Sequence, residues 1–313
     1  MKIYRMLATM LVGLTTVLTA TAQAPATACN TARHDSCQAP HIGGKACHNG
    51  GAVLLPATRK TNVLLAGVGY TNILDTYLSP EKYRGIDVRI MSHTRREKDS
   101  SQWVNQFVHE GNIAFADNRA SNGNEMAGAY AFRYSLMHRW SMRLWQHPLH
   151  IMAGGSVAAN LGFVYNTRNS NNPANARVSI NIEPTVAADY YLGRASLSGA
   201  FKPIGSAEAG FPLVLHYEAS APLLGVMFSP NYGQSYYEIF TRGNYDHNIV
   251  PTTIAATPSF RQMLTLDLNI GRTKWRVGYL GIIDQSQVNN LKTHVYTHAF
   301  MVGVVKTFRT LKQ

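Results

Sequence analysis

The sequence predicts an all-β protein, an antiparallel transmembrane β-barrel of about 12 strands that follows a cleaved signal peptide and a short pre-barrel segment. Three observations predict it. The N-terminus has the pattern of an export signal, long segments alternate between polar and apolar residues, and aromatic residues recur near the ends of those segments. Charged residues make up only 15% of the 313 residues and aromatic residues make up 10%, which excludes an intrinsically disordered chain.

The N-terminus has the three parts of a secretory signal peptide. Lys2 and Arg5 precede a largely apolar run over 7–20, and the small residues Ala20-Thr21-Ala22 then form a cleavage site. The run is shorter than the roughly 18 apolar residues that a transmembrane helix needs, so we expect cleavage after Ala22 and export. We therefore divide the chain into a signal peptide at 1–22, a pre-barrel linker or partial plug at 23–60, and a β-barrel domain at 61–313.

Alternation with a period of two is the main signal in the rest of the chain. Between 175 and 191 the odd positions include Arg177 and Glu183, whereas the even positions include Val178 and Ile180. Successive side chains of a strand point to opposite faces, so this pattern predicts strands with one polar and one apolar face. Soluble strands average about five or six residues, but tilted membrane strands need about nine to eleven. The alternating segments are long, which favours an outer-membrane barrel over a periplasmic β-sandwich.

The expected strands lie at 62–72, 84–95, 102–117, 126–139, 148–166, 175–191, 194–201, 212–228, 235–242, 259–270, 273–284 and 293–308. Their number is even, as in bacterial barrels, but Pro222 requires a bulge or a break, so counts of about ten or fourteen stay open. With both termini in the periplasm, the turns at 192–194 and 271–272 lie on the periplasmic side. The extracellular loops are then 117–125, 166–175, 202–211, 243–258 and 284–292.

Charged residues on the polar faces should point into the lumen if the apolar faces meet lipid. They are Asp87, Arg89, Arg133, Arg177, Glu183, Asp189, Arg194, Glu218, Glu238, Arg242, Asp267, Lys274 and Arg276. Because acids and bases are nearly balanced in this set, we expect a lumen plugged by ion pairs and hydrogen bonds. A path for a substrate or an ion is the alternative interpretation of the same charges.

The pre-barrel segment combines thiols and imidazoles, which are common metal ligands. It contains Cys29, His34, Cys37, His41, Cys47 and His48. Their spacing matches no zinc or haem signature, and thiols of exported proteins tend to pair in an oxidising compartment. We expect one disulfide and a spare thiol, with free thiols as the alternative, and no metal or other cofactor. Lipidation of Cys29 is disfavoured, because no large aliphatic residue stands three positions before it.

The main functional hypothesis is an outer-membrane β-barrel of a Gram-negative bacterium with a structural, adhesive or narrow-transport role. Its expected partners are outer-membrane lipids or lipopolysaccharide and the barrel-insertion machinery. The net charge of +12 suits anionic lipid phosphates. No nucleic-acid partner is expected.

The alternative hypothesis is a lipid hydrolase, of the phospholipase or lipid-deacylase type, at the outer leaflet. Ser286 would be the nucleophile, His294 the base and Asn290 the group that orients the histidine. Enzymes of this kind carry a His-x-Ser pair on a wall strand, and the predicted wall strands have none. This absence makes a non-enzymatic role the stronger of the two hypotheses.

Four stretches carry a resemblance to a family of exported proteins. They are TNILDTYLSP at 71–80, PLLGVMFSP at 222–230, YGQSYYEIF at 232–240 and QSQVNNLKTHVYTH at 285–298. They resemble an outer-membrane β-barrel-like family of unknown function from anaerobic Gram-negative gut and oral bacteria. The resemblance covers about 60–308, nearly the whole mature chain. It implies no activity and no catalytic residues, so the barrel prediction depends on the alternation.

Overall fold

The computed structural model describes residues 57–170, 172–195, 201–202, 211–270 and 273–311. The chain divides into two compact units, Met1–Ala52 and Val53–Gln313, and the described residues all belong to the second. The expected signal peptide, the three cysteines and the pre-barrel histidines therefore lie outside the described residues.

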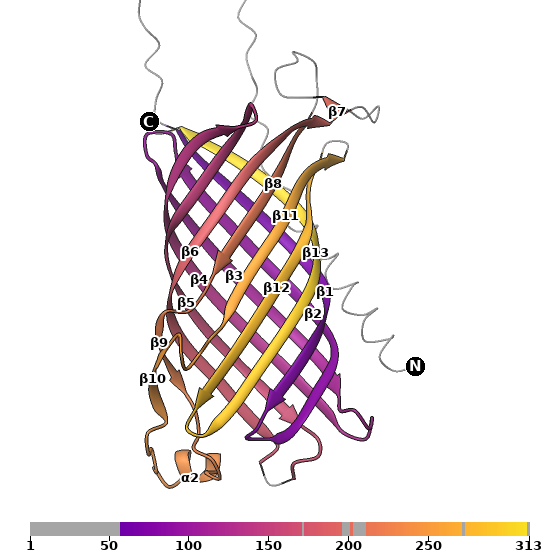
Figure 1. Ribbon diagram of the computed structural model, residues 1–313, viewed down its shortest axis with the longest axis vertical. Helices are drawn as coiled ribbons and strands as arrows, with labels where there is room; N and C mark the ends of the chain where they lie inside the picture. The colour runs from indigo at the N-terminus through magenta and orange to yellow at the C-terminus, as the bar shows by residue number, and fades with distance from the viewer. Residues whose placement is uncertain (1–56, 171, 196–200, 203–210, 271–272, 312–313) are drawn as a thin grey trace, which may run out of the picture. The chain divides into compact units, whose positions relative to one another are not determined.

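Ten antiparallel strands close a barrel (Figure 1). In order around the ring they are β1 (Ala57–Asp75), β2 (Ser79–Lys98), β3 (Trp103–Asp117), β4 (Asn124–Leu144), β5 (His147–Asn166), β6 (Ala174–Ala195), β8 (Phe211–Ser220), β11 (Phe260–Ile270), β12 (Thr273–Val288) and β13 (Leu291–Leu311). β13 pairs with the whole length of β1, which closes the ring. The predicted all-β antiparallel barrel is confirmed, but the ring has ten strands rather than about 12.

Besides the two-residue β7 (Phe201–Lys202), two further strands lie outside the closed ring. The predicted strand at 212–228 is broken, because β8 ends at Ser220 and β9 (Leu224–Phe228) begins only after Pro222. Proline has no backbone N–H to donate to a ladder, so pairing stops there. β9 still pairs with β6, while β10 (Ile249–Thr253) pairs with β9 and is the outermost strand.

The predicted strand at 235–242 is wrong, because this segment forms the helix α2 (Tyr236–Phe240). The Ser235 hydroxyl accepts a hydrogen bond from the Glu238 N–H, and the Glu238 carboxylate accepts one from the Ser235 N–H. This capping box satisfies two N–H groups at the helix start that a strand would need to pair with a neighbour. No helix in the described part of the chain is long and apolar enough to cross a membrane.

The predicted turn at 192–194 is also wrong. β6 continues to Ala195, and Gly193 has a φ of 147° at a shift in the register between β6 and β8, so the glycine marks a β-bulge. The two-residue β7 (Phe201–Lys202) pairs with the end of β6, and no separate strand at 194–201 joins the ring of described strands. Residues 203–210 of the predicted loop at 202–211 lie outside the described residues.

The two ends of the barrel differ in their connections. We call the end with the start of β1 and the end of β13 the terminal rim, and the opposite end, which carries α2, the distal rim (Figure 1). At the distal rim, Asn289 and Asn290 join β12 to β13 with φ values of 52° and 60°. Positive φ at both central residues is typical of a type I′ hairpin, which asparagine tolerates well.

Outward-facing side chains form an apolar belt around the barrel wall. The side chains on β6 are representative. Val178, Ile180 and Ile182 are exposed, whereas Asn181 and Glu183, which point to the other face, are buried. All four tryptophans lie near the terminal rim, namely Trp103, Trp140, Trp145 and Trp275. A belt of this kind with an aromatic girdle at its edge suits the boundary between hydrocarbon and lipid headgroups.

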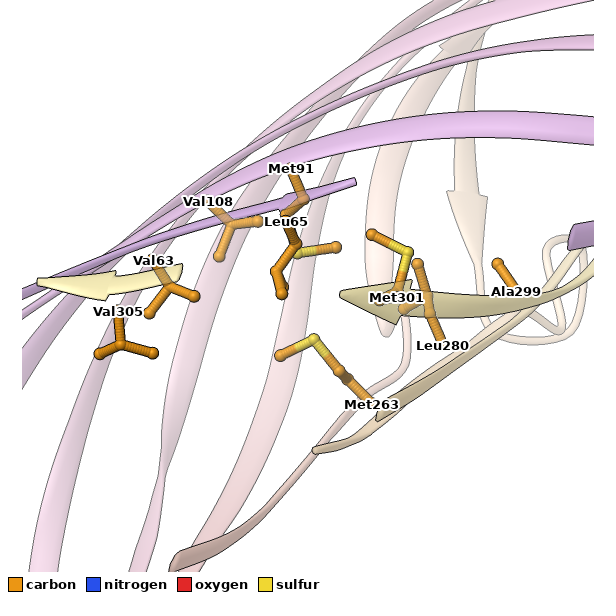
Figure 2. Close-up of a cluster of buried hydrophobic side chains, with 9 residues drawn as sticks. All are labelled: Val63, Leu65, Met91, Val108, Met263, Leu280, Ala299, Met301 and Val305. Carbon is orange, nitrogen blue, oxygen red and sulfur yellow. The ribbon is translucent and has the colours of Figure 1, made fainter. Parts of the chain in front are cut away.

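Inward-facing apolar side chains pack on one side of the lumen (Figure 2). This cluster consists of Val63, Leu65, Met91, Val108, Met263, Leu280, Ala299, Met301 and Val305. A second buried cluster lies toward the distal rim and consists of Ile73, Leu78, Tyr83, Ala114, Ala116, Ala127 and Val164. Side chains therefore occupy much of the space inside this ring, as they do in small barrels.

The belt leads to a prediction about a charge placed on the outer wall. Val157, in the middle of β5, is 47% exposed. We expect Val157→Arg to lower the free energy of unfolding in lipid vesicles by about 2–4 kcal/mol, since the arginine would face the bilayer midplane. Ile249 in β10 is 74% exposed but lies outside the ring, so Ile249→Arg is the control, with an expected change within about 0.5 kcal/mol. Urea unfolding of the vesicle-bound protein measures both, and equal small effects would contradict the belt.

Candidate functional site in the barrel lumen

Buried charged side chains link opposite walls of the lumen through a central network. We give this name to Asp87, Arg89, Gln106, Glu110, Glu218 and Arg261. Arg89 pairs with Asp87 at 3.0 Å and also with Glu110, while Arg261 contacts Glu110 at 3.1 Å and Glu218 at 3.3 Å. Glu110 is on β3 and Arg261 is on β11, which lie on opposite sides of the ring. The network therefore crosses the lumen from wall to wall.

A second group of ion pairs lies closer to the terminal rim. This terminal network consists of Arg95, Asp189, His216, Asp267, Lys274 and Arg276. Arg95 reaches from β2 to Asp189 on β6 with a distance of 2.5 Å between Nη1 and Oδ2. His216 lies between two carboxylates, 2.6 Å from Asp189 and 3.1 Å from Asp267. Arg276 and Lys274 complete the partners of Asp267 at 2.5 and 2.8 Å.

Ten of the residues expected in the lumen make ion pairs inside it. They are Asp87, Arg89, Arg133, Arg177, Glu183, Asp189, Glu218, Asp267, Lys274 and Arg276. Glu238 and Arg242 lie elsewhere, because they belong to the α2 segment: Glu238 caps the helix and Arg242 lies over the Tyr237 ring. The side chain of Arg194 is outside the described part of the structure.

The expected set omits several charged residues that form ion pairs in the lumen, among them Arg95, Glu97, Glu110, Arg139 and Arg261. Four of them continue the alternation of lumen residues predicted on the same strand. Arg95 and Glu97 continue the odd positions of Asp87 and Arg89, Arg139 continues those of Arg133, and Arg261 continues those of Asp267. Glu110 is harder to assign, because His109 beside it is also polar and hides the two-faced pattern.

The structure does not bring the proposed hydrolase residues together. Ser286 points into the lumen, where its Oγ lies 2.7 Å from the Oγ1 of Thr293. His294 points outward, 3.5 Å from the amide oxygen of Asn72, and its ring stacks on Tyr296. Ser286 pairs with Thr293 across the hairpin, so its side chain and that of His294 are on opposite faces of the sheet.

A cavity of about 180 Å³ remains in the distal half of the lumen. Its polar lining includes Arg133, Asn160, Arg177, Ser179, Glu183 and Asp284. Arg133 Nε donates to Glu183 at 2.9 Å, and Arg177 lies 3.3 Å from Asp284 on β12. In the described residues no group of three His, Cys, Asp or Glu side chains could hold a metal ion.

The distal mouth above this cavity is bridged by a distal cap, which we define as the turn at 76–78 and the segment at 229–248. Asn175 on β6 donates to Asp75 on β1 at 2.7 Å, although these strands lie on opposite sides of the ring. The Tyr236 hydroxyl donates to Asn175 at 2.6 Å, and the Tyr77 hydroxyl donates to the Gln234 carbonyl at 2.9 Å. Burial, with the charges of Asp75 and Glu238, raises the pKa of Tyr77 to about 12, which keeps this donor protonated.

The terminal network predicts a large difference between two neighbouring arginines. Arg95 faces the lumen and pairs with Asp189, whereas Arg96 faces outward over the Phe107 ring. Arg95→Met leaves the buried Asp189 without its arginine, so we expect a loss of about 3–5 kcal/mol in the free energy of unfolding. Arg96→Met should cost less than about 1 kcal/mol. Guanidinium unfolding in detergent compares the two, and similar losses would contradict the role of Arg95 as a link across the lumen.

Comparison with known proteins identifies the family. A family described as "Protein of unknown function (DUF3316)" matches residues 56–313, and no curated protein matches the sequence. The barrel is similar to the transport unit of the autotransporter AIDA-I from Escherichia coli, with 7% identity, a TM-score of 0.33, and coverage of 83% of this chain and 93% of that one. It is also similar to the translocator domain of the autotransporter NalP from Neisseria meningitidis, with 10% identity, a TM-score of 0.34, and coverage of 83% and 90%. Since the family match covers most of the chain, the protein belongs to the DUF3316 family.

Proposed function

We propose that this protein is an outer-membrane β-barrel of a Gram-negative bacterium whose lumen is blocked by ion pairs, and that it displays the distal cap at the cell surface in a structural or adhesive role. The observation that carries the proposal is the central network, in which Glu110 and Arg261 meet from opposite walls. An open diffusion pore would need this contact to break.

The outer wall supports insertion in a membrane. Every strand of the ring pairs with a neighbour on both sides, and the outward faces are apolar over the middle of the strands. Polar groups on this wall pair with one another, as in the hydrogen bonds of His109 with Tyr130 at 2.7 Å and of His298 with Tyr279 at 2.5 Å. Such pairing lowers the cost of placing polar side chains against lipid.

The interior supports a blocked lumen rather than a water-filled channel. A ten-stranded ring is close in size to the eight-stranded barrels that side chains fill, and far below the roughly 16 strands of porins. The central and terminal networks and the two apolar clusters together occupy much of this interior. A narrow transport role would require these ion pairs to exchange partners during passage.

The rims support the partners that we expect. Lys82, Arg84 and Lys292 are exposed near the distal rim, where lipopolysaccharide phosphates would lie in our orientation. The last strand carries Phe300, Val302 and Phe308 on its outer face, which suits recognition by barrel-insertion machinery.

The hydrolase alternative has no support from the position of its residues, because Ser286 and His294 point to opposite faces. Another serine–histidine contact, Ser141 Oγ to His150 Nδ1 at 2.8 Å, lies near the terminal rim. No described carboxylate makes a hydrogen bond to the other ring nitrogen of His150, so the orienting group of a catalytic triad is missing there.

The blocked lumen predicts electrical behaviour in planar lipid bilayers. The wild-type protein should give no steady conductance, because the central network crosses the lumen. Glu110→Ala combined with Arg261→Ala removes both large side chains of one crossing pair and should produce discrete openings. Arg96→Ala combined with Lys98→Ala changes exposed positions only and is the control, expected to remain silent. Steady conductance of the wild-type protein would contradict the proposal.

The proposed orientation predicts which positions can be labelled from outside the cell. Tyr245, in the distal cap, is 63% exposed, and Gln102, in the turn between β2 and β3, is exposed at the terminal rim. A membrane-impermeant maleimide on intact cells should label Tyr245→Cys but should label Gln102→Cys only after permeabilisation. The parent protein measures the background from Cys29, Cys37 and Cys47. If Gln102→Cys were labelled in intact cells and Tyr245→Cys were not, the barrel would have the orientation opposite to the one proposed.

A further inference from the structure

We propose that the distal cavity is a binding site for a small neutral polyhydroxylated solute, of the size and chemistry of a monosaccharide. This binding site is independent of the function proposed above, because binding of a solute in the cavity requires neither conductance nor a particular membrane. Its volume of about 180 Å³ is below the roughly 300–1,000 Å³ of pockets that hold drug-sized ligands, and it is ample for several water molecules.

The first observation is a buried guanidinium with unused donors. The Arg133 side chain is only 7% exposed and lines the cavity. Its Nε donates to Glu183, but neither Nη1 nor Nη2 has a hydrogen-bond partner among the described residues. Both nitrogens are open to the cavity, so a ligand oxygen that accepts from them would form a charge-assisted hydrogen bond.

The second observation is that acceptors and another donor lie on the adjoining strands. Asn160 on β5 and Asn181 on β6 both direct their amide nitrogens to the Oγ of Ser179, at 3.2 and 3.4 Å. The amide oxygen of Asn160 then remains as an acceptor, and the Ser179 hydroxyl keeps its own proton to donate. Donors and acceptors are thus interleaved along β4, β5 and β6 on one wall of the cavity.

The charges around the cavity favour a neutral ligand over an ion. Arg133 is paired with Glu183, and Arg177 is paired with Asp284. The remaining charged lining residues, Arg89, Arg261 and Glu110, belong to the central network, whose acids pair with both arginines and balance their charge. A hydroxyl group is both donor and acceptor, so a sugar ring matches this mixed lining without adding a charge.

The test is isothermal titration calorimetry on the folded, detergent-solubilised full chain, with glucose, galactose and mannose as neutral probes and glucuronate and inorganic phosphate as ionic probes. We expect saturable binding of at least one neutral sugar, and at least tenfold weaker or no binding of both anions. Asn160→Ala and Arg133→Gln should each weaken sugar binding at least tenfold.

Matched controls distinguish the cavity from the rest of the barrel. Asn62→Ala changes an outer-wall asparagine, and Arg139→Gln changes an inward arginine of β4 that pairs with Glu97 outside the cavity, so both should bind like the wild type. Asn160→Ala leaves the Arg133–Glu183 pair intact and carries the test if Arg133→Gln does not fold. Absence of sugar binding, tighter binding of an anion, or binding unchanged by Asn160→Ala would overturn the site. None of these outcomes depends on the conductance or labelling results.

Discussion

The pairing of β1 with β13 is the contact on which the rest of the barrel depends. It joins the two ends of the described chain, from Ala57 opposite Leu311 to Asp75 opposite Thr293. Once the ring is closed, every strand of it has a neighbouring strand on both sides, and every side chain must face either the lumen or the outside. On β1, Val63 and Leu65 therefore become buried while Leu64 and Val68 are exposed. The apolar belt and the packed interior are two consequences of the same closure.

The size of the ring determines what the inward charges can do. Charged groups taken out of water need partners with good geometry, and a ring of ten strands is narrow enough for side chains from opposite walls to meet. Glu110 and Arg261 therefore pair across the lumen, and Arg95 reaches Asp189. The residues that stabilise the interior are then also the residues that block it. The distal cavity is where this pairing is incomplete, because the terminal nitrogens of Arg133 face it without a described partner.

Much of the fold and part of the site follow from the alternation of polar and apolar residues along the sequence. The odd positions of β6 put Arg177, Glu183 and Asp189 on one face, and all three make ion pairs in the lumen. Predictions from the local residue pattern were wrong where a capping interaction or a tight turn determined the backbone conformation instead. Tyr236 to Phe240 is rich in the aromatic and β-branched residues that favour strands, but the capping box of Ser235 and Glu238 starts a helix there. Ser286 and His294 looked like neighbours in sequence, yet the two-residue turn at Asn289 and Asn290 pairs Ser286 with Thr293 and so separates the faces.

The sequence by itself determined the class of fold and the two faces of most strands, because the period of two is a property of the extended backbone and needs no distant contact. Only the tertiary structure decided the number of strands in the ring and the partner of each buried charge. Those depend on register between strands and on distances across the lumen, as in the pairing of Arg95 on β2 with Asp189 on β6. Residues so far apart in the chain carry no local signal of one another, so their contact follows only from closure of the barrel.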